Sequence, residues 1–332
     1  MALPAETPAD LPAAAPAPLL SIIVVSYNTA QMTVEAIRSV YDTAGDLDFE
    51  LFVYDNDSTD NSVEAIAAAF PAEDYPNLYL KAVGENLGFA KANNRAAKEA
   101  RGQYLLLLNP DTVVLPGAIQ ALLAFARRRP EARIWGTRNI LGDGSLDYGS
   151  CWGRMTPWSV FSYAVGLEQI FPNSTLFKPE GYGGWDRTTE REVDIVTGCF
   201  LLTDMALWRE LGGFDERFFM YAEEADFCLR ARALGAAPRF TPETEIVHYG
   251  GASDTLRAQK IAKIYAGKLT LAEKHWPAWQ VSLARQFYKL AVLVRWSAYS
   301  LSGALRGKAS HREAGREWRR IWGLRDQWIR GY

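Results

Sequence analysis

Four short apolar runs alternate with helical patterns between residues 19 and 128, and this alternation is the feature that most restricts the fold. The runs occupy residues 19–25, 50–54, 78–83 and 103–108. Helical patterns, one of them preceded by a loop, occupy residues 30–42, 61–70, 88–100 and 116–128. Strands that alternate with helices form parallel βαβ units. We therefore predict an α/β fold, with a mostly parallel sheet that has helices on both faces.

A polar cluster follows each of the four predicted strands. The clusters are residues 26–28, 55–60, 85–86 and 109–111. In open α/β sheets, ligands bind at the carboxyl ends of the strands. Ordinary turn chemistry accounts for any single cluster, because Asn, Asp and Ser are common turn formers. Four clusters at successive strand ends favour a ligand site along this edge of the sheet.

The turn Asn109-Pro110-Asp111 carries the best candidate for a metal ligand. Mg²⁺ and Mn²⁺ prefer oxygen ligands, and they often take only one or two carboxylates while phosphate and water complete the shell. Asp111 is placed for that role, although an Asp after Pro is also an ordinary turn residue. His248 follows a strand-like segment at 241–247 and is the second candidate ligand. A structural role for this histidine is the alternative.

Two phosphate-binding motifs are absent from the sequence. No Gly-x-Gly-x-x-Gly follows the first predicted strand, and no Gly-x-x-x-x-Gly-Lys-Ser/Thr occurs. The first motif is typical of dinucleotide-binding folds and the second of NTPases. Both absences argue against a dehydrogenase or an NTPase.

Three acidic residues, Glu223, Glu224 and Asp226, open a predicted helix at 223–234. Acids in a first turn complement the helix dipole, which is one explanation for them. The other is that one carboxylate acts as a general base that takes a proton from a substrate hydroxyl. Crowding of like charges would raise the pKa of that group toward neutrality. Spacing alone leaves both explanations open.

Taken together, these motifs resemble the inverting glycosyltransferases of family 2, which have a GT-A fold. Within that family, the chain is most similar to bacterial rhamnosyltransferases of the cell-wall and O-antigen type. The resemblance covers roughly residues 19–255. It rests on residues 25–28, 53–60, 85–94, 107–112, 212–216 and 218–230. It implies a GT-A type sheet, mostly parallel but mixed, flanked by helices.

The resemblance also implies roles for individual residues. Asn109 and Asp111 stand where the family has an Asp-x-Asp motif, and the Asn leaves Asp111 as the carboxylate for Mg²⁺ or Mn²⁺. His248 matches a family histidine that completes the metal shell. Glu224 occupies the position of the usual base, with Glu223 and Asp226 as the alternatives.

The resemblance also implies a nucleotide-sugar donor, and it places the pyrimidine nucleotide of that donor at the strand ends. Tyr27 and Asp55 are implied to hold its base, Asp55 by accepting a hydrogen bond from a ring N–H. The predicted nucleotide-binding residues are Val25, Ser26, Tyr27, Asp55, Asp57, Asn86, Gly88, Asn109 and Asp111.

The predicted reaction is metal-dependent transfer of L-rhamnose from dTDP-rhamnose to a saccharide or a lipid-linked glycan in cell-surface polysaccharide synthesis. UDP-galactofuranose, UDP-glucose and UDP-GlcNAc are the alternative donors. A non-catalytic nucleotide-sugar-binding protein is the alternative from another functional class. Nucleic-acid binding fits poorly, because the strand-end carboxylates would repel phosphate in the absence of a metal.

The end of the chain differs from the rest in charge. From residue 251 onward, 16 Lys and Arg stand against 5 Asp and Glu, whereas the preceding residues hold 20 against 34. Six of the eleven tryptophans lie after residue 270, and residues 281–306 carry an apolar stripe at helical spacing. Basic residues with aromatic neighbours suit a helix lying in the plane of an anionic membrane surface. Packing of these helices on the body or on a second copy, as a homodimer, is the alternative.

Three regions follow from these patterns. They are a disordered, Ala- and Pro-rich leader at 1–18, a glycosyltransferase domain at 19–255 and a basic, Trp-rich helical region at 256–332. The sequence has no apolar run long enough for a transmembrane helix. Its three widely spaced cysteines are typical of a reducing compartment. We therefore predict a cytoplasmic protein, peripheral on the inner face of the plasma membrane.

Overall fold

The computed structural model describes residues 17–250 and 257–332. Nearly all of the predicted leader at 1–18 lies outside these residues, as does the predicted boundary between 255 and 256. Pro18 is described and is already attached to the fold, because its carbonyl accepts a hydrogen bond from the Gln103 N–H at 3.2 Å.

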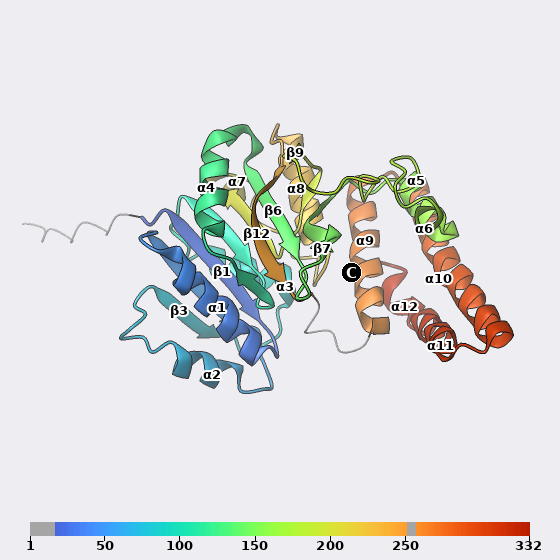
Figure 1. The fold of residues 1–332 in the computed structure, drawn as a ribbon, viewed down its shortest axis with the longest axis horizontal. Helices are drawn as coiled ribbons and strands as arrows, with labels where there is room; N and C mark the ends of the chain where they lie inside the picture. The colour runs from blue at the N-terminus through green and yellow to red at the C-terminus, as the bar shows by residue number, and fades with distance from the viewer. Residues whose placement is uncertain (1–16, 251–256) are drawn as a thin grey trace, which may run out of the picture.

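A mixed sheet of ten strands forms the centre of the larger part of the described chain (Figure 1). Its main path runs in the order β3-β2-β1-β4-β11-β6-β12-β5, with β7 and β9 paired at its margins. The strands are β1 (Leu20–Ser26), β2 (Phe49–Asp55), β3 (Leu78–Ala82), β4 (Tyr104–Leu108), β5 (Thr112–Val114), β6 (Ile134–Ile140), β7 (Leu146–Asp147), β9 (Arg191–Glu192), β11 (Phe200–Asp204) and β12 (Arg239–His248). A separate pair consists of β8 (Cys151–Trp152) and β10 (Ile195–Val196).

The first four strands are parallel, as the alternation of strand and helix predicts. Strands β1, β2 and β4 are buried along their whole length, because helices cover both faces of the sheet. Strand β11 lies antiparallel between β4 and β6, which makes the sheet mixed. The predicted fold class is confirmed.

Helices flank this sheet on both sides. They are α1 (Ala30–Ala44), α2 (Ser62–Ala69), α3 (Gly88–Ala97), α4 (Ala118–Arg128), α7 (Met205–Leu211) and α8 (Glu223–Ala233), with 3₁₀ turns η1 (Pro130–Ala132) and η2 (Tyr148–Ser150). Adjacent residues of β1 enter different apolar clusters: Ile22 and Val24 pack in one, and Ile23 and Val25 pack in the other. This follows from the alternation of side chains along a strand.

Six further helices complete the part of the chain that the structure describes. An excursion from the sheet contains α5 (Pro157–Val165) and α6 (Leu167–Ile170), and the C-terminal part contains α9 (Arg257–His275), α10 (Ala278–Arg306), α11 (Ala309–Gly323) and α12 (Arg325–Trp328). Helix α9 lies between the body and α10, and α10 packs on α5 and α11 (Figure 1). Tyr288, Trp318 and Trp328 belong to the same apolar cluster as Ile23 of β1. The C-terminal helices are therefore packed on the body.

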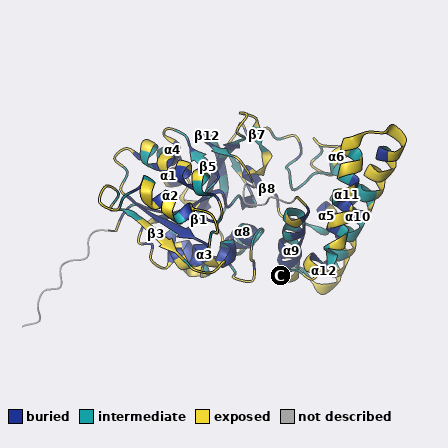
Figure 2. Ribbon diagram, turned by 90° about the horizontal axis from the view of Figure 1, so that it is seen from below, coloured by how far each residue is buried: buried dark blue, intermediate teal, exposed yellow. Residues whose placement is uncertain are grey.

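Most tail tryptophans are packing residues. Trp318 and Trp328 are buried, Trp276, Trp296 and Trp322 pack against the apolar cluster, and Trp279 alone among the six is mostly exposed, at 63%. The buried face of helix α10 coincides only in part with its predicted apolar stripe, of which Phe287 packs against the apolar cluster. Leu283, Leu301 and Leu305 of that stripe are exposed to solvent. Exposed stretches run along α10 in Figure 2.

Candidate active site

A cavity of about 240 Å³ opens at the carboxyl ends of β1 and β4. Strand ends form its walls on one side, and the turn before α8, the first residues of α8 and helix α9 form them on the other. The lining residues are Val25, Tyr27, Thr29, Asn56, Asn86, Phe89, Asn109, Pro110, Asp111, Thr197, Gly198, Cys199, Met220, Tyr221, Glu223, Glu224, His248, Gly250 and Lys260. Residues far apart in the sequence thus share one site.

The sequence analysis found a large part of this lining. Among its candidates, the structure brings together Val25, Tyr27, Asn86, Asn109, Asp111, Glu223, Glu224 and His248. The candidates that do not line the cavity are Ser26, Asp55, Asp57, Gly88 and Asp226.

Asp55 ends β2 opposite Ser26 of β1 and is 2% exposed. Its Oδ1 accepts a hydrogen bond from the Ser58 N–H at 3.0 Å. Its Oδ2 is buried and has no hydrogen-bond partner among the residues that the structure describes. A buried acceptor without a partner is unusual in a folded protein. The next residue, Asn56, lines the cavity.

Asn56 organises the loop after β3, a role that the sequence analysis missed although the residue belongs to the motif at 53–60. Its side chain donates to Asn86 Oδ1 at 3.0 Å and accepts from the Leu87 N–H at 2.9 Å. Gly88 follows with φ +74°, and a Cβ there would lie closer than 3.0 Å to the Phe219 carbonyl oxygen. Gly88 therefore allows this loop to pack against the segment before α8.

Asp57 adopts a left-handed conformation with φ +68° and is exposed. It is not among the residues that line the cavity. Ser26 is buried beneath the cavity, where its hydroxyl bonds Thr29 at 3.3 Å and Thr33 at 2.9 Å. The Ser26 bonds tie the end of β1 to the start of α1.

Asp111 and His248 meet because β5 pairs antiparallel with β12, which sets Thr112 opposite His248. The His248 Nε2 lies 3.6 Å from Asp111 Oδ1, and its Nδ1 lies 3.2 Å from Asp147 Oδ2. Burial lowers the pKa of His248, but the hydrogen bond to Asp147 and the charge of Asp111 outweigh it, so the pKa is raised. The sequence analysis missed Asp147, because β7 lies in a stretch without clear periodicity.

This arrangement fits a divalent cation with few protein ligands. Metal-binding histidines commonly give their second ring nitrogen to a carboxylate, as His248 does with Asp147. In residues 17–250 and 257–332, no cluster of three or more His, Cys, Asp or Glu side chains is arranged to enclose an ion. Asp111 and His248 would thus leave most of a Mg²⁺ or Mn²⁺ shell to phosphate and water.

Glu223 and Glu224 begin α8 and face the same cavity. Burial raises the pKa of both, and for Glu223 the neighbouring Glu224 charge adds to the rise. Backbone N–H groups, including that of Gly198, act in the opposite direction on Glu224. The Oε2 atoms of both residues are buried without a hydrogen-bond partner in the described part of the chain. Such a carboxylate holds a proton more readily than an exposed one.

The backbone before this pair is strained. Tyr221 and Ala222 adopt left-handed conformations with φ +71° and +74°, which cost residues other than glycine of the order of 1 kcal/mol each. Helix α9 packs closely on this turn, since a Cβ on Gly267 would lie closer than 3.0 Å to the Tyr221 carbonyl oxygen. The Tyr332 hydroxyl donates to the Met220 carbonyl at 2.6 Å. Distant segments therefore hold the turn that presents the two glutamates.

Asp226 also belongs to α8, but it does not line the cavity and is fully buried. It pairs with Arg230 at 2.7 Å, Lys274 at 2.8 Å and His275 at 2.8 Å. Burial raises the pKa of Asp226, but the hydrogen bonds from His275 and Lys274 lower it by more, so the net shift is downward. A carboxylate outside the cavity, paired with Arg230 and Lys274 and bonded to His275, is poorly placed to accept a substrate proton.

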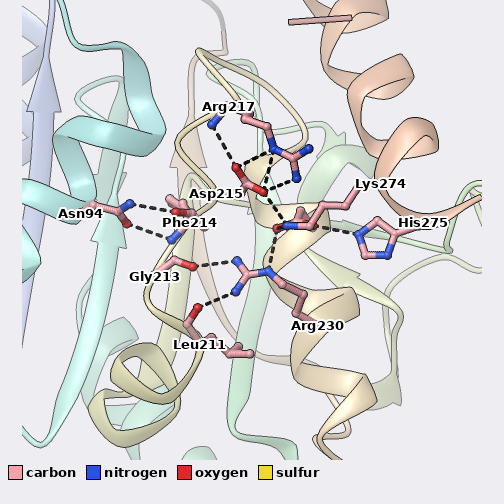
Figure 3. Close-up of polar contacts among 10 residues, drawn as sticks. Asn94, Leu211, Gly213, Phe214, Asp215, Arg217, Arg230, Lys274 and His275 are labelled. Atoms are coloured by element: carbon pink, nitrogen blue, oxygen red, sulfur yellow. Dashed lines mark hydrogen bonds and ion pairs between the residues drawn. The ribbon is translucent and has the colours of Figure 1, made fainter.

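The same cluster joins α9 to the loop before α8 (Figure 3). Lys274 also pairs with Asp215 at 2.7 Å, and Arg230 donates to the carbonyls of Leu211 and Gly213. The motif at 212–216 thus anchors the C-terminal helices to the body. The motif was recognised in the sequence, but its contact with Lys274 of α9 was not predicted.

Lys260 is a cavity residue that the sequence analysis missed. It lies on α9, and its charge lowers the pKa of His248 in part. It therefore brings an ammonium group toward the Asp111–His248 corner.

Comparison with known proteins places this chain in a family. A family model described as glycosyl transferase family 2 matches residues 21–209, more than half of the chain. The N-acetylglucosaminyl-diphospho-decaprenol L-rhamnosyltransferase of Mycobacterium tuberculosis is 29% identical over 247 residues, which cover 70% of this chain and 76% of that protein. The rhamnosyltransferase WbbL of Escherichia coli is 22% identical over 236 residues, covering 70% and 83%.

Solved structures share the fold. The mannosyltransferase PcManGT from Pyrobaculum calidifontis, in complex with GDP-Man and Mn²⁺, aligns with a TM-score of 0.57 and 16% identity, covering 94% of this chain and 88% of that one. S. aureus TarS in complex with UDP-GlcNAc aligns with a TM-score of 0.50 and 17% identity, covering 93% and 81%. The fold is of the GT-A type.

Proposed function

The chain belongs to glycosyltransferase family 2, and from that premise we propose that it transfers L-rhamnose from dTDP-rhamnose to a saccharide or lipid-linked glycan in cell-surface polysaccharide synthesis. Two rhamnosyltransferases among its relatives support this donor, and one of them is named for a lipid-diphosphate acceptor. The observation that carries the proposal is that Glu224 faces the same cavity as the Asp111–His248 pair. A base and a site for a leaving diphosphate thus share one space.

Glu224 is the proposed base. Its raised pKa and its unpartnered Oε2 suit a carboxylate that takes a proton from an acceptor hydroxyl. As that proton moves to Glu224, the hydroxyl oxygen forms a bond to the anomeric carbon, and the bond from that carbon to the diphosphate breaks. A single displacement inverts the anomeric centre. Glu223, which lies more deeply beside it, is the alternative base.

The strand-end residues are proposed to hold the nucleotide. Asp55 Oδ2 accepts from the N–H of a pyrimidine ring, and Tyr27 covers the ring. Asn86 and Asn109 provide polar contacts along the sugar and the diphosphate.

The diphosphate is proposed to lie at the corner of Asp111, His248 and Lys260. Mg²⁺ or Mn²⁺ held by Asp111 and His248 would neutralise charge on the departing diphosphate. Lys260 adds a positive charge at the same corner and stabilises the negative charge that develops on the diphosphate.

The test is thermal stabilisation by a panel of nucleotide sugars, with and without Mg²⁺ or Mn²⁺. We expect dTDP-rhamnose to raise the Tm in a metal-dependent manner, and UDP-galactofuranose, UDP-glucose and UDP-GlcNAc to raise it less. The Asp111→Ala variant should lose the metal dependence while it remains folded. Stabilisation by NAD in place of any nucleotide sugar would overturn the assignment.

Attachment to a membrane surface is part of the proposal. Within the described ranges, no helix has the length and apolar character needed to cross a bilayer. Exposed Leu301 and Leu305 lie beside the exposed basic residues Arg306 and Lys308. Apolar side chains next to cations suit the surface of an anionic bilayer. We therefore propose a peripheral position on the inner face of the plasma membrane.

Sedimentation with liposomes tests this surface. Full-length protein should sediment with vesicles that contain phosphatidylglycerol, and the Leu301→Asp, Leu305→Asp double variant should not. A truncation near residue 275 is unsuitable, because Tyr288 and Trp328 belong to the core. Equal sedimentation of both proteins would refute the proposal, and loss of a dimer in the variant would assign the face to a second copy instead.

A further inference from the structure

A second cavity, of about 150 Å³, lies where the α5–α6 excursion meets α9 and α10. It offers about ten times the ~10–15 Å³ that one water molecule needs. Its polar walls consist of three tyrosines and three charged residues. They are Tyr163, Tyr265, Tyr288, Glu168, Glu180 and Lys268. None of these residues takes part in the proposed reaction.

The polar groups around this cavity are held in place by one another. Lys268 Nζ pairs with Glu180 Oε2 at 2.9 Å, and the Ser159 hydroxyl donates to Glu180 Oε1 at 2.6 Å. The hydroxyls of Tyr163 and Tyr265 bond each other at 2.7 Å. Fixed donors and acceptors around an open space reduce the ordering cost of binding a polar ligand.

Helix α9 lines both cavities with the same face. Lys260 lines the active-site cavity, while Ile264 and Lys268 line the second one. These residues are spaced by four, so they follow one another along one side of the helix, with about 6 Å between neighbours at 1.5 Å per residue. Gly267, next to Lys268, packs on the strained turn before Glu223. The second cavity therefore lies farther along α9 than the active-site cavity, on the same side of the helix.

The charges restrict what the second cavity can hold. Two carboxylates and one ammonium give no excess of positive charge, and burial, together with the charge of Glu180, raises the pKa of Glu168. Burial lowers the pKa of Lys268, but Glu180 outweighs it and the net shift is upward, so Lys268 stays paired. Burial also raises the pKa of Tyr288, so its hydroxyl stays protonated. A phosphate would meet two acids here, whereas a ring with many hydroxyls finds donors, acceptors and aromatic faces.

We propose that this cavity is a subsite for an uncharged sugar residue of the acceptor, at a distance from the hydroxyl that reacts. The inference rests on the proposed function, because only a sugar-transfer reaction has an acceptor. It predicts that a longer saccharide binds better than a single sugar, and that a phosphate group does not occupy the subsite.

Ligand-observed NMR tests the subsite without any donor. The probes are the methyl glycoside of N-acetylglucosamine, N,N′-diacetylchitobiose and inorganic phosphate. We expect the disaccharide to bind the wild-type protein, and Ile264→Trp, which fills the cavity, to weaken that binding by about tenfold or more. Lys268→Met should weaken it several-fold, because it leaves Glu180 without its cation. Lys98→Met, at an exposed position remote from both cavities, is the matched control.

The outcomes separate this inference from the proposed function. Failure of every nucleotide sugar to react, with saccharide binding still lost in Ile264→Trp, would overturn the reaction but keep the subsite. Absence of saccharide binding to wild-type protein, unchanged binding in a folded Ile264→Trp variant, or displacement of the disaccharide by phosphate would each overturn the subsite. If Ile264→Trp does not fold, Tyr163→Phe and Lys268→Met decide the question by the same measurement.

Discussion

The two sides of the active-site cavity are built in different ways. The strand-end side lies at or after the ends of successive parallel strands, and its residues are Val25, Tyr27, Thr29, Asn56, Asn86, Phe89, Asn109, Pro110 and Asp111. The helix side comes from residues 197–198, 219–224 and 260, and it depends on α9 and on Tyr332. Short loops fix the first side locally, whereas packing between distant segments fixes the second. Substitutions should therefore act differently on the two sides.

The largest expected effect is on the helix side. Glu224→Gln should lower turnover by about 10²–10⁴-fold, because the amide cannot take the acceptor proton. Nucleotide affinity should stay near the wild-type value, since Glu224 lies across the cavity from the strand ends. A steady-state assay with dTDP-rhamnose measures the first effect and calorimetry with dTDP the second. Glu223→Gln is the matched control, and a larger loss in that variant would transfer the role of base to Glu223.

On the strand-end side, Asp55→Ala should act through binding. Loss of a buried charged acceptor costs roughly 1.5–3 kcal/mol, so affinity for dTDP should fall by about 10–100-fold. Asp57→Ala, two residues away but exposed, should leave affinity unchanged. Calorimetry with dTDP and Mg²⁺ makes the comparison. Equal losses in both variants would show that the loop conformation matters and the Asp55 oxygen does not.

Gly267→Ala tests whether α9 holds the strained turn. The added Cβ would overlap the Tyr221 carbonyl, so the turn or the helix must move, at a cost of about 1–3 kcal/mol. We expect a several-fold fall in kcat with little change in dTDP affinity. Gly323→Ala, in α11 with open space around it, should instead raise the Tm slightly. A fall in dTDP affinity equal to that in kcat would show that the two sides are not independent.

The smallest effect concerns stability and pH. Burial raises the pKa of Glu224, so the folded protein binds its proton more tightly than the unfolded chain does. That contribution to stability is complete below the unfolded pKa and is lost as pH rises through the folded pKa. Glu224→Gln should therefore raise the free energy of unfolding at pH 8 by about 1.4 kcal/mol for each unit of pKa elevation, and change it little at pH 4. The Tm of both proteins at the two pH values measures this difference. A gain that is equal at both pH values would contradict the buried charge as its cause.

Much of the strand-end side was predictable. Alternating strands and helices imply parallel pairing, and the carboxyl ends of parallel strands converge at one edge of the sheet. Tyr27, Asn86 and Asp111 could therefore be placed near one another before any coordinates were known. The predicted pair of Asp111 and His248 also met, although the strand pairing between β5 and β12 that joins them was not predicted.

The helix side was less predictable. Asp226 stands two residues from Glu224, yet the turn of the helix sends it into a cluster of cations from α8 and α9. Lys260 and Asp147 carry no motif, and they reach the site through contacts between distant segments.

The basic tail shows the same division. Its composition correctly indicated helices, but aromatic and basic residues serve equally well in a core, on a membrane or between subunits. Packing decided that Trp318 and Trp328 are internal and that Leu301 and Leu305 are exposed. Periodicity and turn chemistry are local properties that a chain carries in its order of residues, so the strands, the strand-end clusters and the acidic helix start could be read from it. Which side chains face each other across hundreds of residues depends on how whole surfaces fit together, and that was settled only when the chain folded.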